Sequence, residues 1–384
     1  MKHLLFSSKI FKGSKYGEGH PLDIDRVWPS LELLKKMKWI NEDEVIFNDI
    51  ASIDDLLLFH DENYIKALQY AEKHQNLPHH LKLKYKIGIG NNPIFKEVFS
   101  RPASAANSSI TAVEYLFKDK SDKILNFSGG THHGRSSFAS GFCFLNDCIL
   151  AIIKAIRLGF SKILYIDIDA HHCDAVQDYF VDEKNVHLIS VHEKMRWPKT
   201  GLLSDCIHEN ILNVPVPENL NDKEMKMIFK NLIFPYSITF NPDLTIIQAG
   251  TDCLDGDPQS KMRLSNNMYW YLLSELKKIS KKTLILGGGG YNPYITAKAW
   301  AGNWLVLNNK EHLLNSDLNI ECKKLLCSLK WNNVRVKNGI PKNWLHSWRD
   351  PKQKNNVRYE IFKLIDEIFE YKNKSKFFAN NFIH

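Results

Sequence analysis

The sequence has few of the features that mark secreted or membrane proteins. Its seven cysteines form no Cys-x-x-Cys pair, and an odd, scattered set argues against a disulfide framework and for a reducing compartment. No stretch approaches the roughly 18 apolar residues of a membrane span, and the apolar run at residues 4–6 is too short for a signal peptide. We therefore expect a cytoplasmic protein that does not span a membrane.

The sequence also lacks the signatures of common nucleic-acid and nucleotide sites. The net charge is +8, but the lysines are spread along the whole chain, which is typical of a solvated surface with a mild basic bias. We find no helix-turn-helix, zinc-finger or single-strand-binding signature, so we expect no specific nucleic-acid binding. The four consecutive glycines at 287–290 are not followed by lysine, which argues against a Walker phosphate loop.

What the chain does have is an alternation of apolar and amphipathic segments. It is 384 residues long, with 44% hydrophobic and 24% charged residues, as in ordinary globular enzymes. The continuous apolar runs are typical of parallel strands buried on both faces, and helical patterns lie between them. The alternation predicts an open α/β fold, with the residues after about 311 packed on the sheet as helices and loops. The expected strands are residues 124–127, 163–168, 186–191, 244–247 and 283–286, and the expected helices are residues 146–158, 222–231 and 267–279.

Polar clusters follow four of the expected strands. They occupy residues 128–133, 167–174, 248–252 and 287–291. In open α/β folds, ligands bind beyond the carboxyl ends of the strands. The four clusters therefore predict one functional site at one edge of the sheet.

The densest cluster holds three aspartates and two histidines within residues 167–174. On an extended strand, Asp167, Asp169 and His171 would project to the same face. So much charge at a strand end needs compensation, and a divalent metal is the simplest kind. Asp169 and His171 would be two ligands of a zinc-like ion. Asp252 is the best candidate for a third, although an aspartate after a strand often caps a turn or helix instead.

The second notable feature is the pair His132 and His133, which has glycines on both sides that let the backbone approach a ligand closely. The two imidazoles could be ligands, bases or hydrogen-bonded core residues. Asp167 and Asp174 could each accept an N–H from one imidazole and so fix its tautomer. Tyr291 follows the four glycines, which could form a tight, mobile turn that brings the phenol into the cleft; alternatively, Tyr291 packs on the surface.

In this order and spacing, four motifs resemble the zinc-dependent histone deacetylase superfamily, which includes acetoin-utilisation proteins and acetylpolyamine amidohydrolases. The motifs are residues 129–133, 140–147, 167–172 and 287–291, and the resemblance extends from about residue 16 to about residue 304. It implies one catalytic domain over residues 1–384 with an arginase/deacetylase-like fold, in which helices flank a mostly parallel sheet of about eight strands.

The resemblance also implies a role for individual residues. The zinc ligands would be Asp169, His171 and Asp252. His132 would pair with Asp167, and His133 with Asp174. Tyr291 would hydrogen-bond the substrate carbonyl. Gly141 and Phe142 would line an acyl-lysine tunnel, with Trp197 in the opposite wall. Asp167, Asp169, His171 and Ser190 would surround a structural K⁺ or Na⁺.

The implied reaction is removal of an acyl group, most simply acetyl, from an acylated amine such as acetyl-lysine by metal-activated water. We expect His133 to move the protons and His132 to give electrostatic support. Asn91 is the nearest match to an aspartate that grips the substrate backbone in class I deacetylases, and an amide carries no charge. Trp197 could narrow the tunnel, and Lys199 at its rim would disfavour cationic substrates such as polyamines.

Several alternatives stay open at this point. The substrate could be an acetylpolyamine or another small acylated amine. The site could belong to a binuclear manganese hydrolase of the arginase type, although such sites need more bridging aspartates. The chain could also be a non-catalytic acyl-lysine-binding module, which would be expected to lack a ligand, the histidine pair or the tyrosine. Iron(II) suits the same ligands as zinc.

Overall fold

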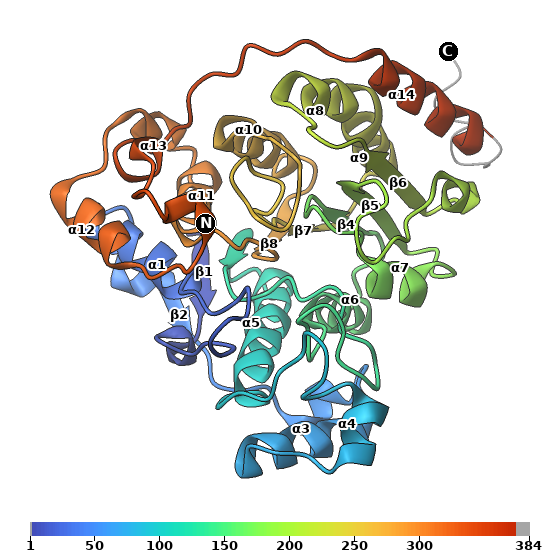
Figure 1. Ribbon diagram of the computed structural model, residues 1–384. Helices are drawn as coiled ribbons and strands as arrows, with labels where there is room; N and C mark the ends of the chain where they lie inside the picture. The colour runs from blue at the N-terminus through green and yellow to red at the C-terminus, as the bar shows by residue number, and fades with distance from the viewer. Residues whose placement is uncertain (1, 374–384) are drawn as a thin grey trace.

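Eight strands, all paired in parallel, form one sheet in the computed structural model, which describes residues 2–373 (Figure 1). Their spatial order is β2-β1-β3-β8-β7-β4-β5-β6. The expected α/β fold around a mostly parallel sheet of about eight strands is confirmed. The strands are β1 Leu4–Ser7, β2 Val45–Phe47, β3 Lys123–Asn126, β4 Ile163–Asp167, β5 Val186–Glu193, β6 Ile211–Val216, β7 Leu244–Gln248 and β8 Lys282–Leu286.

Five of these strands, β3, β4, β5, β7 and β8, coincide with the expected apolar runs. Three strands were not recognised in the sequence. β1 is the short apolar run near the N-terminus, and it is fully enclosed between β2 and β3. β2 and β6 are the two edge strands; β2 has three partly exposed residues, and β6 contains Pro215, which removes a backbone donor. Short or proline-containing edge strands carry a weak sequence signal.

Helices cover both faces of the sheet (Figure 1). Apolar residues of α5, α6 and α7 form the core on one face, and those of α1, α8, α9, α10 and α11 form the larger core on the other. The expected helices correspond to α6, α8 and α10, and a π-helical turn at Phe229–Ile233 joins α8 to α9. The helices are α1 Val27–Lys36, α2 Ile53–Leu56, α3 Glu62–His74, α4 His79–Tyr85, α5 Ser100–Phe117, α6 Asp147–Leu158, α7 Asp174–Phe180, α8 Asp222–Ile228, α9 Phe234–Phe240, α10 Asn266–Leu276, α11 Pro293–Leu307, α12 Ile320–Ser328, α13 Lys342–Leu345 and α14 Tyr359–Lys372.

Local sequence explains the limits of helix α6, which begins beside the site. The Asn146 side chain accepts a hydrogen bond from the Ile149 backbone N–H and caps the first turn. Gly159 ends the helix in the left-handed conformation, with a φ of 109°. The residues between are largely apolar and buried, so the helix packs against the sheet and holds its N-terminus near the β3 strand end.

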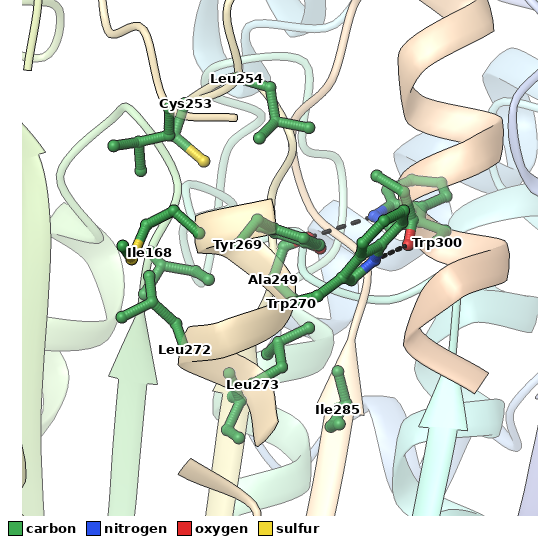
Figure 2. Close-up of a cluster of buried hydrophobic side chains, with 14 of the residues drawn as sticks. Ile168, Ala249, Cys253, Leu254, Tyr269, Trp270, Leu272, Leu273, Ile285 and Trp300 are labelled. Atoms are coloured by element: carbon green, nitrogen blue, oxygen red, sulfur yellow. Dashed lines mark hydrogen bonds between the residues drawn. The ribbon is translucent and has the colours of Figure 1, made fainter. Parts of the chain in front are cut away.

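A hydrogen-bonded aromatic cluster supports the end of β7 (Figure 2). The Ala249 carbonyl accepts hydrogen bonds from the Tyr269 hydroxyl at 2.7 Å and from Trp300 Nε1 at 3.1 Å. Trp270 Nε1 donates to the Ala299 carbonyl at 2.9 Å. All these groups are buried, so the bonds remove the cost of enclosing polar atoms among apolar side chains. The cluster thus fixes the backbone that leads from β7 to Asp252.

The C-terminal segment packs mainly on helices rather than directly on the sheet. Helices α12 and α13 contact α1 and α11, because those two helices already cover that part of the sheet face. Helix α14 reaches β6 and α8, and Arg358 Nε lies 2.6 Å from Glu224 Oε1 beside it. Within residues 2–373, no helix combines the length and the apolar character that crossing a membrane would require.

Candidate active site

The four polar clusters meet because their strands are neighbours. Strands β3, β8, β7 and β4 are adjacent in the sheet and run in the same direction. Their carboxyl ends therefore open on one edge, and each end delivers one of the clusters recognised in the sequence.

Asp169, His171 and Asp252 come together at this edge, with one potential ligand atom from each lying within 4.8 Å of the others. His171 Nδ1 is 3.0 Å from Asp169 Oδ1 and 3.0 Å from Asp252 Oδ2. The expectation that Asp169 and His171 extend a strand was wrong, because β4 ends at Asp167. Asp167 Oδ1 instead accepts the Asp169 N–H, and Asp169 Oδ1 accepts the His171 N–H, which turns the chain after the strand.

The charge distribution of this triad fits a divalent cation. Both carboxylates are almost completely buried. Burial opposes a positive charge on His171, yet the two carboxylates outweigh it and raise the pKa of His171 to about 10. Burial and the charge of Asp169 raise the pKa of Asp252 to about 6. Two buried carboxylates around one imidazole form a negative site, and this oxygen and nitrogen donor set suits zinc or iron(II).

Backbone and amide donors hold the triad in place. The Gly289 N–H donates to Asp169 Oδ2 at 2.7 Å, and Gln248 Nε2 donates to the same oxygen at 3.0 Å. A Cβ on Gly289 would lie 2.1 Å from Asp252 Oδ2, so only glycine lets the backbone come this close. The glycine run, expected to form a tight turn, thus also packs the backbone against the carboxylates.

Two histidine–aspartate pairs stand beside the triad. His132 Nδ1 lies 2.7 Å from Asp167 Oδ2, and His133 Nδ1 lies 2.7 Å from Asp174 Oδ1. These are the two pairs expected from the sequence. The ring centroids of His132 and His133 are only 4.0 Å apart, so the charge of one imidazole affects the other.

The two imidazoles differ in charge. Burial opposes protonation of His132, but the charges of Asp167 and Asp169 raise its pKa to about 9. Burial and the neighbouring positive charge of His132 lower the pKa of His133 to about 3, although the hydrogen bond that His133 donates to Asp174 acts in the opposite direction. At neutral pH, His133 is therefore the neutral member, whose ring can accept a proton.

A cavity of about 380 Å³ opens onto this edge and is lined by His133, His171, Gly141, Phe142, Trp197 and Tyr291. The Trp197 ring stands edge-on to His133, with the centroids 4.6 Å apart. A Cβ on Gly141 would lie 2.5 Å from Trp197 Cη2, so a side chain there would close the passage. Tyr291 is buried with 7% exposure, and the alternative that it packs on the surface was wrong. Burial and the Asp252 and Asp169 carboxylates hold the pKa of Tyr291 well above its usual 10, so its hydroxyl keeps the proton.

The remaining predicted residues lie around this centre. Asn91 lines the cavity, and its carbonyl oxygen lies 3.1 Å from His20 Nε2. Ser190 pairs with Asp167 across β4 and β5, and its hydroxyl lies 2.9 Å from His192 Nδ1. A monovalent cation bound by Asp167, Asp169, His171 and Ser190 stays a prediction.

Sequence reasoning missed several residues that shape the site. Asp147 accepts hydrogen bonds from the Gly130 and Thr131 N–H groups and so holds the turn before the histidine pair. Asp257 Oδ2 accepts the Tyr291 N–H at 2.6 Å. Lys86 lines the cavity although it lies outside the four motifs, five residues before Asn91. Asp147 stands inside a recognised motif and could have been found, whereas an isolated lysine gives no signal.

Comparisons with known proteins show to which family the chain belongs. The sequence pattern of the histone deacetylase domain matches residues 20–307. Histone deacetylase 8 of Xenopus tropicalis is 31% identical over 274 residues, covering 70% of this chain and 72% of that protein. Human histone deacetylase 1 is 29% identical over 291 residues, covering 74% of this chain and 60% of that protein.

Solved structures extend the likeness to nearly the whole chain. A crystal structure of an HDAC homologue from Aquifex aeolicus has a TM-score of 0.90 and 33% sequence identity, covering 97% of this chain and 100% of that one. An HDAC homologue complexed with SAHA gives a TM-score of 0.89 at the same identity and coverage. The alternative of a non-catalytic binding module is thereby set aside. The chain belongs to the histone deacetylase family and is a hydrolytic deacetylase.

Proposed function

We propose that this deacetylase removes an acetyl group from an acylated amine, most simply acetyl-lysine, with a zinc ion held by Asp169, His171 and Asp252. One observation carries the proposal: the neutral imidazole of His133, the ligand residue His171 and the phenol of Tyr291 all line the same cavity. Metal-dependent amide hydrolysis requires a metal ion that polarises the amide, a base that accepts the proton of water, and a hydrogen-bond donor for the oxyanion.

The ion would contribute Lewis acidity: zinc polarises a carbonyl and lowers the pKa of a bound water from 15.7 towards about 7. Two carboxylate ligands neutralise much of its charge, so Asp169 and Asp252 leave more of the catalysis to the surrounding side chains. Iron(II) is the alternative ion for the same three ligands. A structural K⁺ or Na⁺ beside Asp167 and Ser190 is part of the same proposal.

His133 is the proposed proton carrier. Its Nδ1 is bound to Asp174 at 2.7 Å, which leaves Nε2 for proton transfer at the cavity. Nε2 takes a proton from the attacking water and later gives it to the nitrogen of the leaving amine. Transfer of this kind is typically worth about 10²–10⁴ in rate.

His132 and Tyr291 act by charge and hydrogen bonding. His132, whose Nδ1 lies 2.7 Å from Asp167 Oδ2, gives electrostatic support to the developing oxyanion. The Tyr291 hydroxyl, which stays protonated, donates to the substrate carbonyl oxygen as negative charge develops on it. Gly141, Phe142 and Trp197 form the walls that position the acyl chain.

Turnover and metal content of two variants test the proposal. His133→Ala and Tyr291→Phe should each lower kcat strongly on acetyl-lysine peptides while the ion stays bound. His80→Ala and Tyr359→Phe are matched controls, since both side chains are exposed and distant in sequence from the site motifs. A near-normal kcat for His133→Ala or Tyr291→Phe would remove that residue from the mechanism, and a panel of acetyl-lysine peptides and acetylated small amines would identify the substrate class.

A further inference from the structure

The entrance of the active-site cavity has an unusual charge pattern. Among the described residues that line the cavity, none is Asp or Glu. Apart from Tyr291 and the two histidines, the polar residues of the lining are Asn91, Asn92, Ser140, Gln259 and Lys86. Apart from the two histidines at the metal and proton-transfer site, Lys86 is the cationic residue of the lining.

The backbone of Lys86 is fixed relative to the cavity wall. The Asn92 side chain is buried and donates to the Lys86 carbonyl at 3.2 Å and to the Ala139 carbonyl at 3.1 Å. Its Oδ1 accepts the Phe142 N–H at 3.1 Å. Asn92 thus ties the Lys86 segment to the loop that carries Gly141 and Phe142, so the lysine has a constant place at the entrance.

The ammonium group of Lys86 also has a contact of its own. Lys86 Nζ lies 4.1 Å from the centroid of the Phe138 ring, a cation–π contact next to the tunnel loop. Within residues 2–373, no carboxylate forms an ion pair with Lys86, and its side chain is exposed. The positive charge is therefore not compensated by a carboxylate among the described residues.

Two other cationic residues, Arg196 and Lys199, differ from Lys86. Arg196 donates to the Gln259 carbonyl at 2.7 Å, and its Nη2 lies 2.6 Å from Glu193 Oε1. Lys199, which the sequence suggested as the rim lysine, is exposed and is not among the lining residues. Among the described residues that line the cavity, Lys86 is thus the one lysine or arginine, and it attracts negatively charged substrates.

We propose that Lys86 selects acylated amines that carry a carboxylate near the acyl-amide arm. This inference rests on the proposed function, since it names the class of substrate that reaches the same catalytic groups. The carboxylate could be the α-carboxylate of a free acetyl-lysine or an acidic side chain beside an acetyl-lysine in a peptide. In either source, the anion pairs with the Lys86 ammonium while the acyl arm enters the tunnel between Phe142 and Trp197.

The test uses two pairs of substrates that differ by one charge. The first is an Nα-capped Nε-acetyl-lysine with a free carboxylate and its methylamide; the second is an acetyl-lysine peptide flanked by aspartate or by asparagine. For an exposed ion pair, kcat/KM should be about 2- to 5-fold higher for the charged member of at least one pair, and the responding pair identifies the source. The preference should shrink near 1 M salt, where screening acts over about 3 Å.

Variants assign the preference to the lysine. K86Q should abolish the preference and K86E should reverse it, while K84Q should retain it, because Lys84 is an exposed neighbour that does not line the cavity. Calorimetric binding of both compounds of each pair to K86Q and to the unmodified protein measures the same charge effect without turnover. Equal kcat/KM and equal affinity within both pairs would overturn the inference. Charge-dependent binding without hydrolysis of any compound would refute the proposed function alone.

Discussion

The pairs His132–Asp167 and His133–Asp174 have the same chemical make-up and the same 2.7 Å contact, yet their surroundings differ. Asp167 also accepts the Tyr165 hydroxyl, and His132 Nε2 lies 3.9 Å from Asp169. His132 is thus surrounded by negative charge and keeps its proton.

The pair His133–Asp174 has a positive charge beside its carboxylate. The Asp174 carboxylate is shared with Arg135, whose Nη2 lies 2.6 Å from Asp174 Oδ2. Arg135 thus opposes the charge of Asp174, and burial together with the positive charge of His132 lowers the pKa of His133 to about 3. The difference teaches that burial and the charges around each imidazole, rather than the histidine–aspartate motif itself, decide which imidazole can accept a proton.

The largest expected effect comes from removing the imidazole of His133. His133→Ala should lower kcat by about 10²–10⁴-fold, because proton transfer is lost. His132→Ala should cost less, because it removes electrostatic support alone. Steady-state kinetics on the same peptide compares them, and a larger loss for His132→Ala would reverse the two roles.

His60, another buried histidine, shows how burial changes the pKa of an imidazole that has no carboxylate partner among the described residues. His60 Nε2 accepts the Asn146 N–H at 3.0 Å, and burial lowers the pKa of His60 from 6.5 to about 4. Below pH 6.5 the unfolded chain binds a proton that the folded chain excludes, so stability should fall between pH 6.5 and 4. The shift corresponds to about 3 kcal/mol.

Denaturant unfolding of the unmodified protein and His60→Gln across this pH range measures that contribution. The variant should show a weaker loss of stability on acidification. Parallel curves for the two proteins would mean that burial alone does not depress a histidine pKa here, which would also weaken the explanation for His133.

Replacing each aspartate by asparagine separates the pairs further. Asp174→Asn should lower kcat by about 10–100-fold with metal affinity retained, since Asp174 contacts no ligand residue. Asp167→Asn should weaken metal binding as well, because Asp167 accepts the backbone N–H of the ligand Asp169. Metal titration with kinetics measures both, and equal metal affinity in the two variants would contradict this distinction.

The smallest expected effect comes from Arg135→Gln, with a loss in kcat below about 10-fold. Without Arg135, the Asp174 charge acts more fully on His133 and raises its pKa. Because His133 must be neutral to accept a proton, the acid limb of the kcat/KM profile should move to higher pH. Arg157→Gln, an exposed arginine on α6, is the control. An unchanged acid limb in Arg135→Gln would show that Arg135 does not tune His133.

The sequence could predict the residues of the centre but not all of their surroundings. Asp169, His171 and the histidine pair stand in dense motifs at strand ends, where buried charge needs a chemical reason. Lys86 and Arg135 stand outside the four motifs, and their contacts with Phe138 and Asp174 become known only when the loops are folded. The edge strands β2 and β6 were not predicted, because half-exposed or proline-containing strands do not show the long apolar runs that mark buried strands.

Metal stoichiometry tests the central claim most directly, because Asp167 and Asp174 can act as partners of histidines only if their side chains are not ligands of a second divalent ion. Metal-free protein would be titrated with Zn²⁺ while deacetylation of an acetyl-lysine peptide is followed. The account predicts no activity without metal and a plateau at one ion per chain. A plateau at two ions, or full activity without any metal, would contradict it.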